Sequence, residues 1–166
     1  MSKKIHKPTK KIAKVPVIMQ LEALECGAAC LTMILAYYDK WIPLEQIRRD
    51  CGVSRDGSKA GNVLKAARNH GLLAQGYRME LEALKTSATF PCIIHWNFNH
   101  FVVLDGFKGN YAVLNDPAAG RVLIPMKTFD ESFTGICLTF EPSDEFKPSG
   151  HKTSMFGCDK RGQKYK

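Results

Sequence analysis

The sequence predicts an α+β domain in which helices come first and an antiparallel sheet follows. Apolar residues recur at helical spacing between residues 27 and 70, whereas short β-rich runs separated by turn residues occupy most of residues 72–141. With 166 residues, 45% of them hydrophobic, the chain can bury one core. Together these observations favour a single domain whose helices and strands are segregated along the chain.

Three helices are predicted in the first half of the chain, over residues 27–40, 42–52 and 56–72. In the first, one stripe holds the apolar residues Ala28, Leu31, Ile34, Leu35 and Tyr38. The third has Ser58 as a candidate N-cap and Gly71 at its end. The stripe should face the core.

The second half reads as strands joined by hairpin-type turns, with two short helical turns between them. The predicted strands are residues 72–79, 90–96, 100–107, 111–116, 121–125 and 136–141, and the predicted helical turns are residues 80–87 and 126–133.

Basic residues are concentrated at the two ends of a chain with net charge +8. Residues 1–15 contain lysines and no acid, and residues 147–166 contain one acid among many bases, so the body between them is mildly acidic. Such ends can bind an anionic membrane surface or nucleic acid, or can simply be solvated. We therefore predict a basic flexible arm over residues 1–14 and a polar basic tail over residues 149–166.

The chain as given is expected to be soluble and to work in a reducing compartment. No apolar run reaches the roughly 18 residues of a spanning helix, and no apolar segment of a secretory signal follows the basic N-terminus. The six cysteines lack the dense spacing of a small disulfide-stapled domain. Neither a metal nor another cofactor is indicated.

Cys26 is the candidate nucleophile. It stands where the first helical pattern opens, and the N-terminal end of a helix favours the thiolate by lowering the thiol pKa. Cys30 lies one turn further in and should pack in the core. The alternatives are a structural Cys26, or metal binding by the two cysteines, although no second Cys/His pair lies at zinc-ligand spacing.

His100 is the candidate base and Asp116 the candidate orienting group. His100 begins a predicted strand right after a turn, where its ring can reach a cleft, whereas His95 alternates with apolar residues inside a strand. Asp116 ends the next strand, and antiparallel pairing puts the end of that strand beside the start of its neighbour. Turn chemistry before Pro117 also explains an aspartate there.

Gln20 is the candidate oxyanion donor. Acyl transfer develops negative charge on the carbonyl oxygen, and a side-chain amide together with the nucleophile's backbone N–H can stabilise it. Gln20 stands six residues before Cys26, on the segment that enters the helix.

The motifs ECGAACL, NHFVVL and LNDPAAG, in this order and with the Gln20–Cys26 spacing, resemble the bacteriocin-processing peptidase domains of peptidase-containing ABC transporters. The resemblance covers residues 15–148 and implies a papain-like fold and a cysteine endopeptidase. It implies Cys26 as nucleophile, His100 as base, Asp116 as orienting group and Gln20 as oxyanion donor. Asn115, next to Asp116, leaves the third member ambiguous, because papain itself uses an amide.

The resemblance also implies a substrate and a partner. The substrate would be a bacteriocin or lanthipeptide precursor whose leader, an amphipathic helix, ends in Gly-Gly or a similar pair. The partner would be an ABC transporter at the cytoplasmic side of the bacterial membrane, although this chain contains neither a spanning segment nor a Walker motif. We therefore expect an excised domain or a stand-alone relative, with the basic ends facing the membrane.

Apolar side chains are the candidates for substrate binding. Bulky residues near Trp96 and Phe98 would narrow the channel for the two glycines, and a groove away from the cysteine would bind the leader helix. The candidate residues are Met19, Leu21, Leu24, Tyr77, Met79, Trp96 and Phe98, each of which could equally belong to the core.

Three alternatives to the peptidase remain at the level of sequence. A catalytically silent relative would only bind leaders and recruit cargo, a nucleic-acid binder would depend on the basic ends, and a thiol acyltransferase or amidase would use the same residues without a glycine requirement. Loss of the cysteine is expected of the silent relative, and Cys26 is present.

Overall fold

A computed structural model describes residues 7–52 and 59–151. Its elements are η1 (Ala23–Glu25), α1 (Cys26–Tyr37), α2 (Leu44–Asp50), α3 (Ala60–Asn69), β1 (Leu72–Arg78), α4 (Leu81–Ser87), β2 (Cys92–Trp96), β3 (His100–Lys108), β4 (Tyr111–Asp116), β5 (Gly120–Pro125), α5 (Met126–Ser132) and β6 (Phe133–Pro142). The predicted α+β class is confirmed, and each predicted helix and strand is present near its expected position. Helix α3 begins after Lys59, and the predicted N-cap Ser58 lies outside the described residues.

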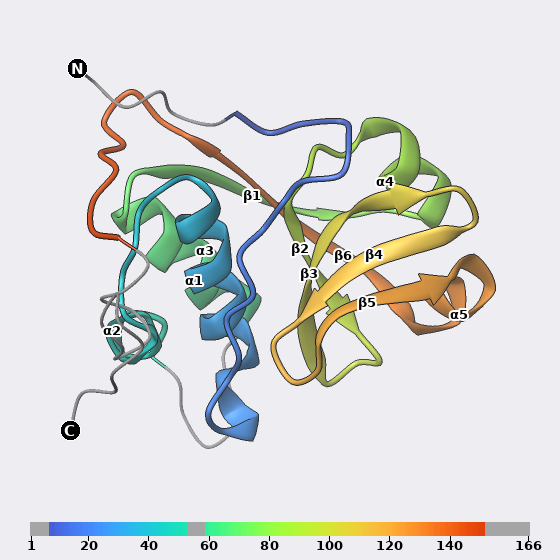
Figure 1. Ribbon diagram of the computed structural model, residues 1–166, viewed down its shortest axis with the longest axis horizontal. Helices are drawn as coiled ribbons and strands as arrows, with labels where there is room; N and C mark the ends of the chain where they lie inside the picture. The colour runs from blue at the N-terminus through green and yellow to red at the C-terminus, as the bar shows by residue number, and fades with distance from the viewer. Residues whose placement is uncertain (1–6, 53–58, 152–166) are drawn as a thin grey trace, which may run out of the picture.

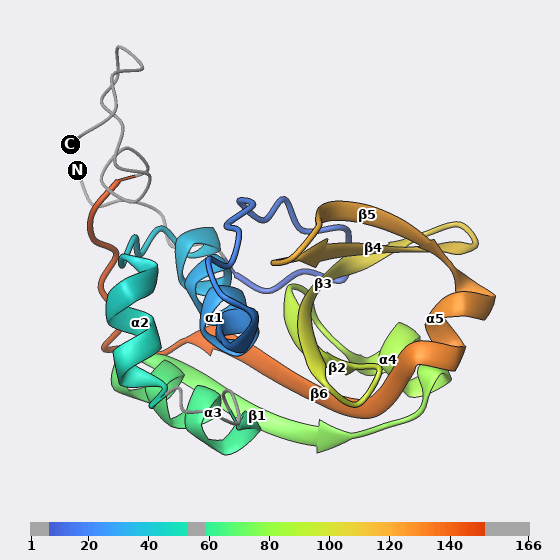
Figure 2. The same cartoon turned by 90° about the horizontal axis from the view of Figure 1, so that it is seen from below.

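The six strands form one sheet in the order β1-β6-β2-β3-β4-β5, and every neighbouring pair is antiparallel. Helices α1, α2 and α3 gather beside one end of the sheet, with α1 packed on β3 and α3 packed on β1 (Figure 1). The sheet curls away from them, and α4 and α5 lie at its other end (Figure 2). The N-terminus of α1 therefore lies next to the start of β3.

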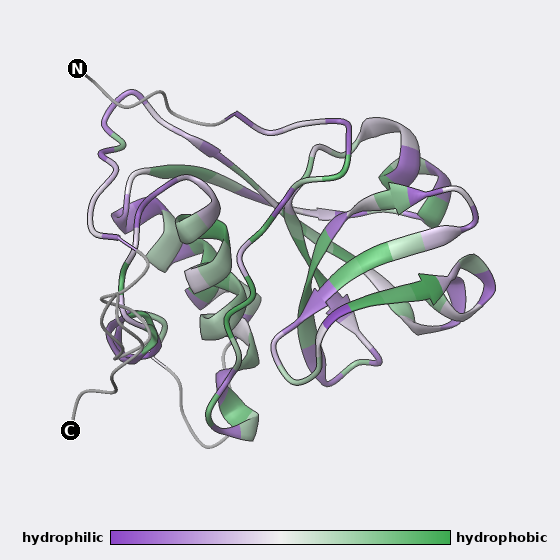
Figure 3. Ribbon diagram, viewed as in Figure 1, coloured by the Kyte–Doolittle hydropathy of each residue, from purple (hydrophilic) through white to green (hydrophobic). Residues whose placement is uncertain are grey.

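Helix α1 is buried on all sides rather than along one stripe. Every residue from Cys26 to Ala36 is buried. The helix contacts β3, α2 and α3, so no face is left for water. Apolar residues accordingly run along α1 and the central strands (Figure 3).

An aromatic cluster joins α5 to β2, β3 and the start of β6. Phe129 of α5 lies 5.4 Å from Trp96, 5.6 Å from Phe107 and 5.5 Å from Phe133, measured between ring centroids. Such contacts contribute beyond the burial of their area. Trp96 is thus part of the packing that fixes the end of β2.

The segment expected to be a flexible arm is docked over its described part. Thr9 and Phe90 exchange both backbone hydrogen bonds, at 2.9 and 2.7 Å. Lys10 Nζ donates to the carbonyl oxygens of Ser87 at 2.8 Å and Ala88 at 3.2 Å, where α4 ends and a cation is favoured. The expectation of a free arm is therefore wrong for these residues. The hydrophobic periodicity of the sequence does not reveal that this segment pairs with residues about eighty positions away.

Residues near the other end of the chain are docked on the fold as well. Ser149 accepts the Trp41 N–H at 2.7 Å and donates its own N–H to Asp39 O at 3.0 Å. Phe146 is buried against Gly71, whose φ of +93° suits glycine and whose missing Cβ leaves room for the Phe146 backbone.

Asp105 is a buried carboxyl at the bulge in β3. It is fully buried, and its closest charged partner is Arg121, with Nε 3.4 Å from Oδ2. Burial raises the pKa of Asp105 to about 7, although Arg121 acts in the opposite direction. Arg121 also donates to the carbonyl oxygen of Val15. The folded protein therefore holds a proton here that the unfolded chain releases near pH 4.

We expect the free energy of unfolding to fall between about pH 4 and pH 7 because of Asp105. The folded state binds the extra proton in this window, so stability decreases as pH rises, by as much as about 4 kcal/mol. Urea unfolding of wild type and Asp105→Asn at pH 4 and pH 8 measures this. The substitution should flatten the decrease, and the exposed Asp144→Asn should not. Equal decreases in wild type and Asp105→Asn would contradict the assignment.

Candidate active site

Helix α1 presents Cys26 as its first residue. Cys26 is buried, with 8% of its surface exposed, at the edge of the core where α1 begins. The backbone N–H groups of Gly27 and Phe101 donate hydrogen bonds to it, as does the side chain of His100. The start of β3 and the start of α1 therefore meet at this sulfur.

His100 and Asp116 meet because β3 and β4 are antiparallel. The register pairs Val103 with Asn115, which places the start of β3 beside the end of β4. His100 Nε2 lies 2.7 Å from Asp116 Oδ1, which leaves Nδ1 as the ring nitrogen available to the cysteine. Asp116 Oδ1 also accepts the Ala118 N–H at 2.8 Å, so the carboxylate is held by its own turn.

The electrostatics of this group favour a charged cysteine. Burial raises the pKa of the Cys26 thiol, but the hydrogen bond and positive charge of His100 and the two backbone N–H groups outweigh burial, so the net pKa is lowered. The pKa of Cys30, one turn further in, is raised well above its ordinary range by complete burial and by the nearby Cys26 and Asp116 charges. Of these two cysteines, Cys26 is therefore the one suited to act as a thiolate.

The histidine is held in its protonated form. The hydrogen bond to Asp116, followed by the one to Cys26, raises the pKa of His100 to about 9 against the effect of burial. Burial raises the pKa of Asp116, but the bonds from His100 and the backbone outweigh burial and the net pKa is lowered. The arrangement places a protonated imidazole beside Cys26, where it favours the thiolate, with the Asp116 carboxylate behind it.

Gln20 lies beside the turn that carries Asp116. Its backbone N–H donates to Pro117 O at 2.8 Å. Its side-chain Oε1 is buried and has no hydrogen-bond partner within the described parts of the chain. Gln20 is thus tied to the same corner as His100 and Asp116, with an amide oxygen that the fold does not use.

Asn115, the alternative third member, points elsewhere. Its side chain is buried, and Nδ2 donates to Val15 O at 3.2 Å. The Asn115 side chain therefore connects the N-terminal segment to β4, and Asp116 rather than Asn115 contacts His100.

Four of the seven apolar candidates are exposed next to this corner. Leu21 is 84% exposed and Phe98 79% exposed, and Met19 and Leu24 are also exposed. Met19 approaches Gly120, which follows the Asp116 turn. Asn97 and Phe98 have φ angles of 51° and 62°, a region unfavourable for residues with a Cβ, so the β2–β3 turn holds Phe98 outward at some energetic expense.

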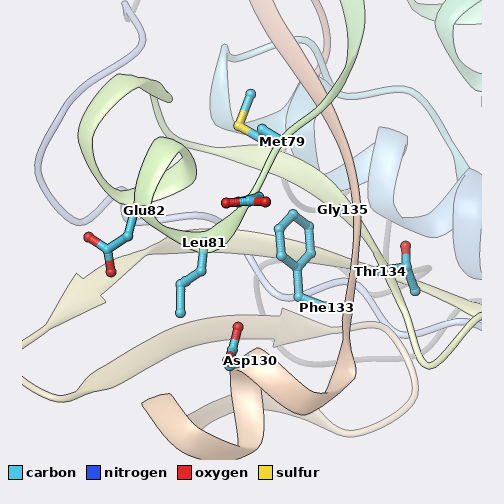
Figure 4. Close-up of a pocket in the computed structure, with 8 residues that line it drawn as sticks. Met79, Leu81, Glu82, Asp130, Phe133, Thr134 and Gly135 are labelled. Atoms are coloured by element: carbon cyan, nitrogen blue, oxygen red, sulfur yellow. The ribbon is translucent and has the colours of Figure 1, made fainter.

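The other three candidates lie apart from these four. The Trp96 ring belongs to the Phe129 cluster. Tyr77, which is also exposed, lies near the end of β1, and Met79 directly follows that strand. Strands β6 and β2 separate β1 from β3. Met79 lines a pocket of about 480 Å³ together with Leu81, Phe133 and acidic residues (Figure 4). Sequence spacing could not show that β1 would be an edge strand at the far side of the sheet.

The other histidines in the described parts of the chain have structural partners or lie in the tail. His70 ends α3 and contacts Asp50 Oδ2 at 2.8 Å, and His95 Nδ1 contacts Thr134 Oγ1 at 3.1 Å. Glu25, to which we assigned no role from sequence, is buried directly before Cys26. Its only signal in the sequence is an acidic residue at the opening of a helix.

The sequence matches the model of one protein family, described as the peptidase C39 family, over residues 14–145. In Escherichia coli, the probable microcin-H47 secretion/processing ATP-binding protein MchF is 41% identical over 133 residues, which are 80% of this chain and 19% of that protein. The colicin V secretion/processing ATP-binding protein CvaB, also from Escherichia coli, is 40% identical over 142 residues, which are 86% of this chain and 20% of that protein. The chain thus spans about a fifth of the length of these curated relatives.

Solved structures give the same picture. A double glycine motif protease from an AMS/PCAT transporter, determined in complex with the leader peptide, is 72% identical, with a TM-score of 0.82 over 83% of this chain and 99% of that one. The peptidase domain of Streptococcus ComA has a TM-score of 0.73 at 20% identity, over 79% of this chain and 99% of that one, a likeness in fold alone. None of the helices in the described segments is both long and apolar enough to cross a bilayer.

Proposed function

Since this chain belongs to the peptidase C39 family, we propose that it is a cysteine endopeptidase that removes leader peptides after a Gly-Gly-type motif from bacteriocin or lanthipeptide precursors. The observation that carries the proposal is the contact of Cys26 with His100, backed by Asp116 at 2.7 Å. The 72% identity to a double glycine motif protease supports the choice of substrate.

The chemistry divides into two halves around a thioester. The Cys26 thiolate attacks the carbonyl carbon of the second glycine, and the oxyanion accepts hydrogen bonds from the Gln20 side-chain amide and the Cys26 backbone N–H. The C–N bond then breaks, and the departing amine takes the proton of the His100 imidazolium. Water, deprotonated by His100, hydrolyses the thioester and releases the leader as a carboxylate with the thiolate restored.

The exposed apolar residues beside this corner give the leader helix a surface. We assign Met19, Leu21, Leu24 and Phe98 to it, because these exposed apolar side chains gather beside the corner that carries Cys26 and Asp116, and a group of such side chains marks a binding surface. The relatives named as secretion/processing ATP-binding proteins are about five times longer than the matched region. The proposed partner is accordingly an ABC transporter, with this domain on the cytoplasmic side of the membrane.

Incubation with a Gly-Gly precursor tests the function. We expect mass spectrometry to show the freed leader and mature peptide with wild-type protein, and a rate about 100-fold lower when alanine replaces the second glycine, since the proposed specificity requires a site too narrow for a Cβ. A precursor that binds and stays intact would favour a silent leader-binding domain. Equal cleavage of both peptides would favour a less selective thiol hydrolase.

A further inference from the structure

Glu25 is a buried carboxylate that the proposed chemistry does not use. It directly precedes Cys26, and its side chain is 2% exposed. A buried carboxylate is strongly unfavourable unless charged or hydrogen-bonding groups surround it. Its contacts therefore indicate what it holds in place.

Both oxygens of Glu25 are engaged. Oε2 accepts the backbone N–H groups of Leu21 at 2.9 Å and Glu22 at 3.1 Å, and Oε1 lies 3.1 Å from Nη1 of Arg48 on α2. Nη2 of Arg48 also lies 3.5 Å from the Glu22 carboxylate. The carboxylate thus closes residues 21–25 into a turn, and the guanidinium fastens that turn to α2.

This turn is one of two anchors on Gln20. On one side, the Gln20 N–H is bonded to Pro117 O at 2.8 Å, next to Asp116. On the other side, the residue that follows Gln20 is bonded to Glu25. The Gln20 amide oxygen is buried but has no hydrogen-bond partner within the described residues, so the place of the side chain depends on packing and on these backbone anchors.

We propose that Glu25, held by Arg48, is a positioning residue for the oxyanion donor Gln20. An oxyanion donor lowers the barrier only if it is already aimed where charge develops, and a displacement of about 1 Å can reduce the rate about 100-fold. The inference rests on the proposed peptidase function and adds to it a link from α2 to the reacting carbonyl.

Arg48→Ala tests the link, and Arg49→Ala is the matched control. Both arginines lie on α2, but Arg49 is 69% exposed, and its one ion pair among the described residues is with Glu45 of the same helix, at 3.7 Å. We expect Arg48→Ala to lower kcat on a Gly-Gly precursor about 10- to 100-fold with KM nearly unchanged. The melting temperature should also fall, because Glu25 Oε1 loses its charged partner, so the kinetic comparison is made well below it. Alkylation of Cys26 as a function of pH should stay as in wild type, because thiolate formation depends on His100. Arg49→Ala should match wild type throughout.

The effect should vanish when Gln20 is already absent. Gln20→Ala alone should lower kcat about 100- to 1,000-fold, and adding Arg48→Ala or Glu25→Gln to it should cause little further loss. Equal losses in both backgrounds, a changed alkylation profile, or unchanged kcat in Arg48→Ala would each overturn the positioning role. An inactive wild-type protein would overturn the proposed function itself.

Discussion

Cys26→Ala is expected to abolish cleavage of a Gly-Gly precursor, with a loss in kcat of at least about 10⁴-fold. The substitution removes the sulfur that would form the thioester, and the pKa of Cys30 is raised too far for it to replace Cys26 as a thiolate. A single-turnover assay followed by mass spectrometry measures both the loss and the absence of an acyl-enzyme. Binding of the leader should persist, since the exposed apolar residues are untouched.

Cys30→Ala is the matched control for this experiment. Cys30 lies on the same helix one turn away and is completely buried, so its loss should affect stability more than catalysis. Alkylation at neutral pH should label Cys26 in this variant as in wild type. Substantial cleavage by Cys26→Ala would place the nucleophile elsewhere and remove the basis of the proposed mechanism.

The candidate catalytic residues could be found from sequence because local rules place each of them. A helix start predicts where Cys26 lies, a strand start predicts His100, and one hairpin is enough to bring Asp116 beside it, as the 2.7 Å contact shows. Gln20 could be proposed as the oxyanion donor because it stands only six residues before Cys26 in the sequence. Each inference depended on at most two neighbouring elements.

The apolar candidates for substrate binding were harder to assign from sequence, because their place in the fold depends on the strand order. Tyr77 and Met79 share hydrophobicity with Leu21 and Phe98, yet the order β1-β6-β2-β3 places them on the far edge of the sheet. The long-range insertion of β6 between β1 and β2 has no periodic signature in the sequence. Trp96 likewise turned out to pack on Phe129, a residue over thirty positions later.

Glu25 shows the same limit at the site itself. From the sequence, Glu25 is only an acidic residue at the start of a helix. The helix dipole favours negative charge there, which explains the residue without any further role. Its contact with Arg48 on α2 becomes visible only when the helices are packed. A buried charge is therefore a feature that coordinates reveal and spacing does not.

His100→Ala is expected to lower kcat/KM about 10³- to 10⁴-fold and to change the pH dependence of the cysteine. Without the imidazolium, burial raises the pKa of Cys26, and the departing amine loses its proton donor. In wild type, activity should fall above about pH 9 as His100 loses its proton, and should also fall at low pH as Cys26 becomes a neutral thiol. The rate of Cys26 alkylation between pH 5 and pH 10 measures the change.

Asp116→Asn supplies the graded comparison. The hydrogen bond that His100 donates to the Asp116 carboxylate is the largest cause of the raised pKa of His100. An uncharged asparagine at position 116 should therefore move the alkaline limb of kcat/KM below pH 9, while the imidazole ring keeps its position. The loss in rate should be smaller than in His100→Ala, because the proton donor remains. If the alkaline limb stays in place in Asp116→Asn, Asp116 orients the ring without setting its charge. If Cys26 in His100→Ala is alkylated with the wild-type pH profile, the thiolate forms without the imidazole.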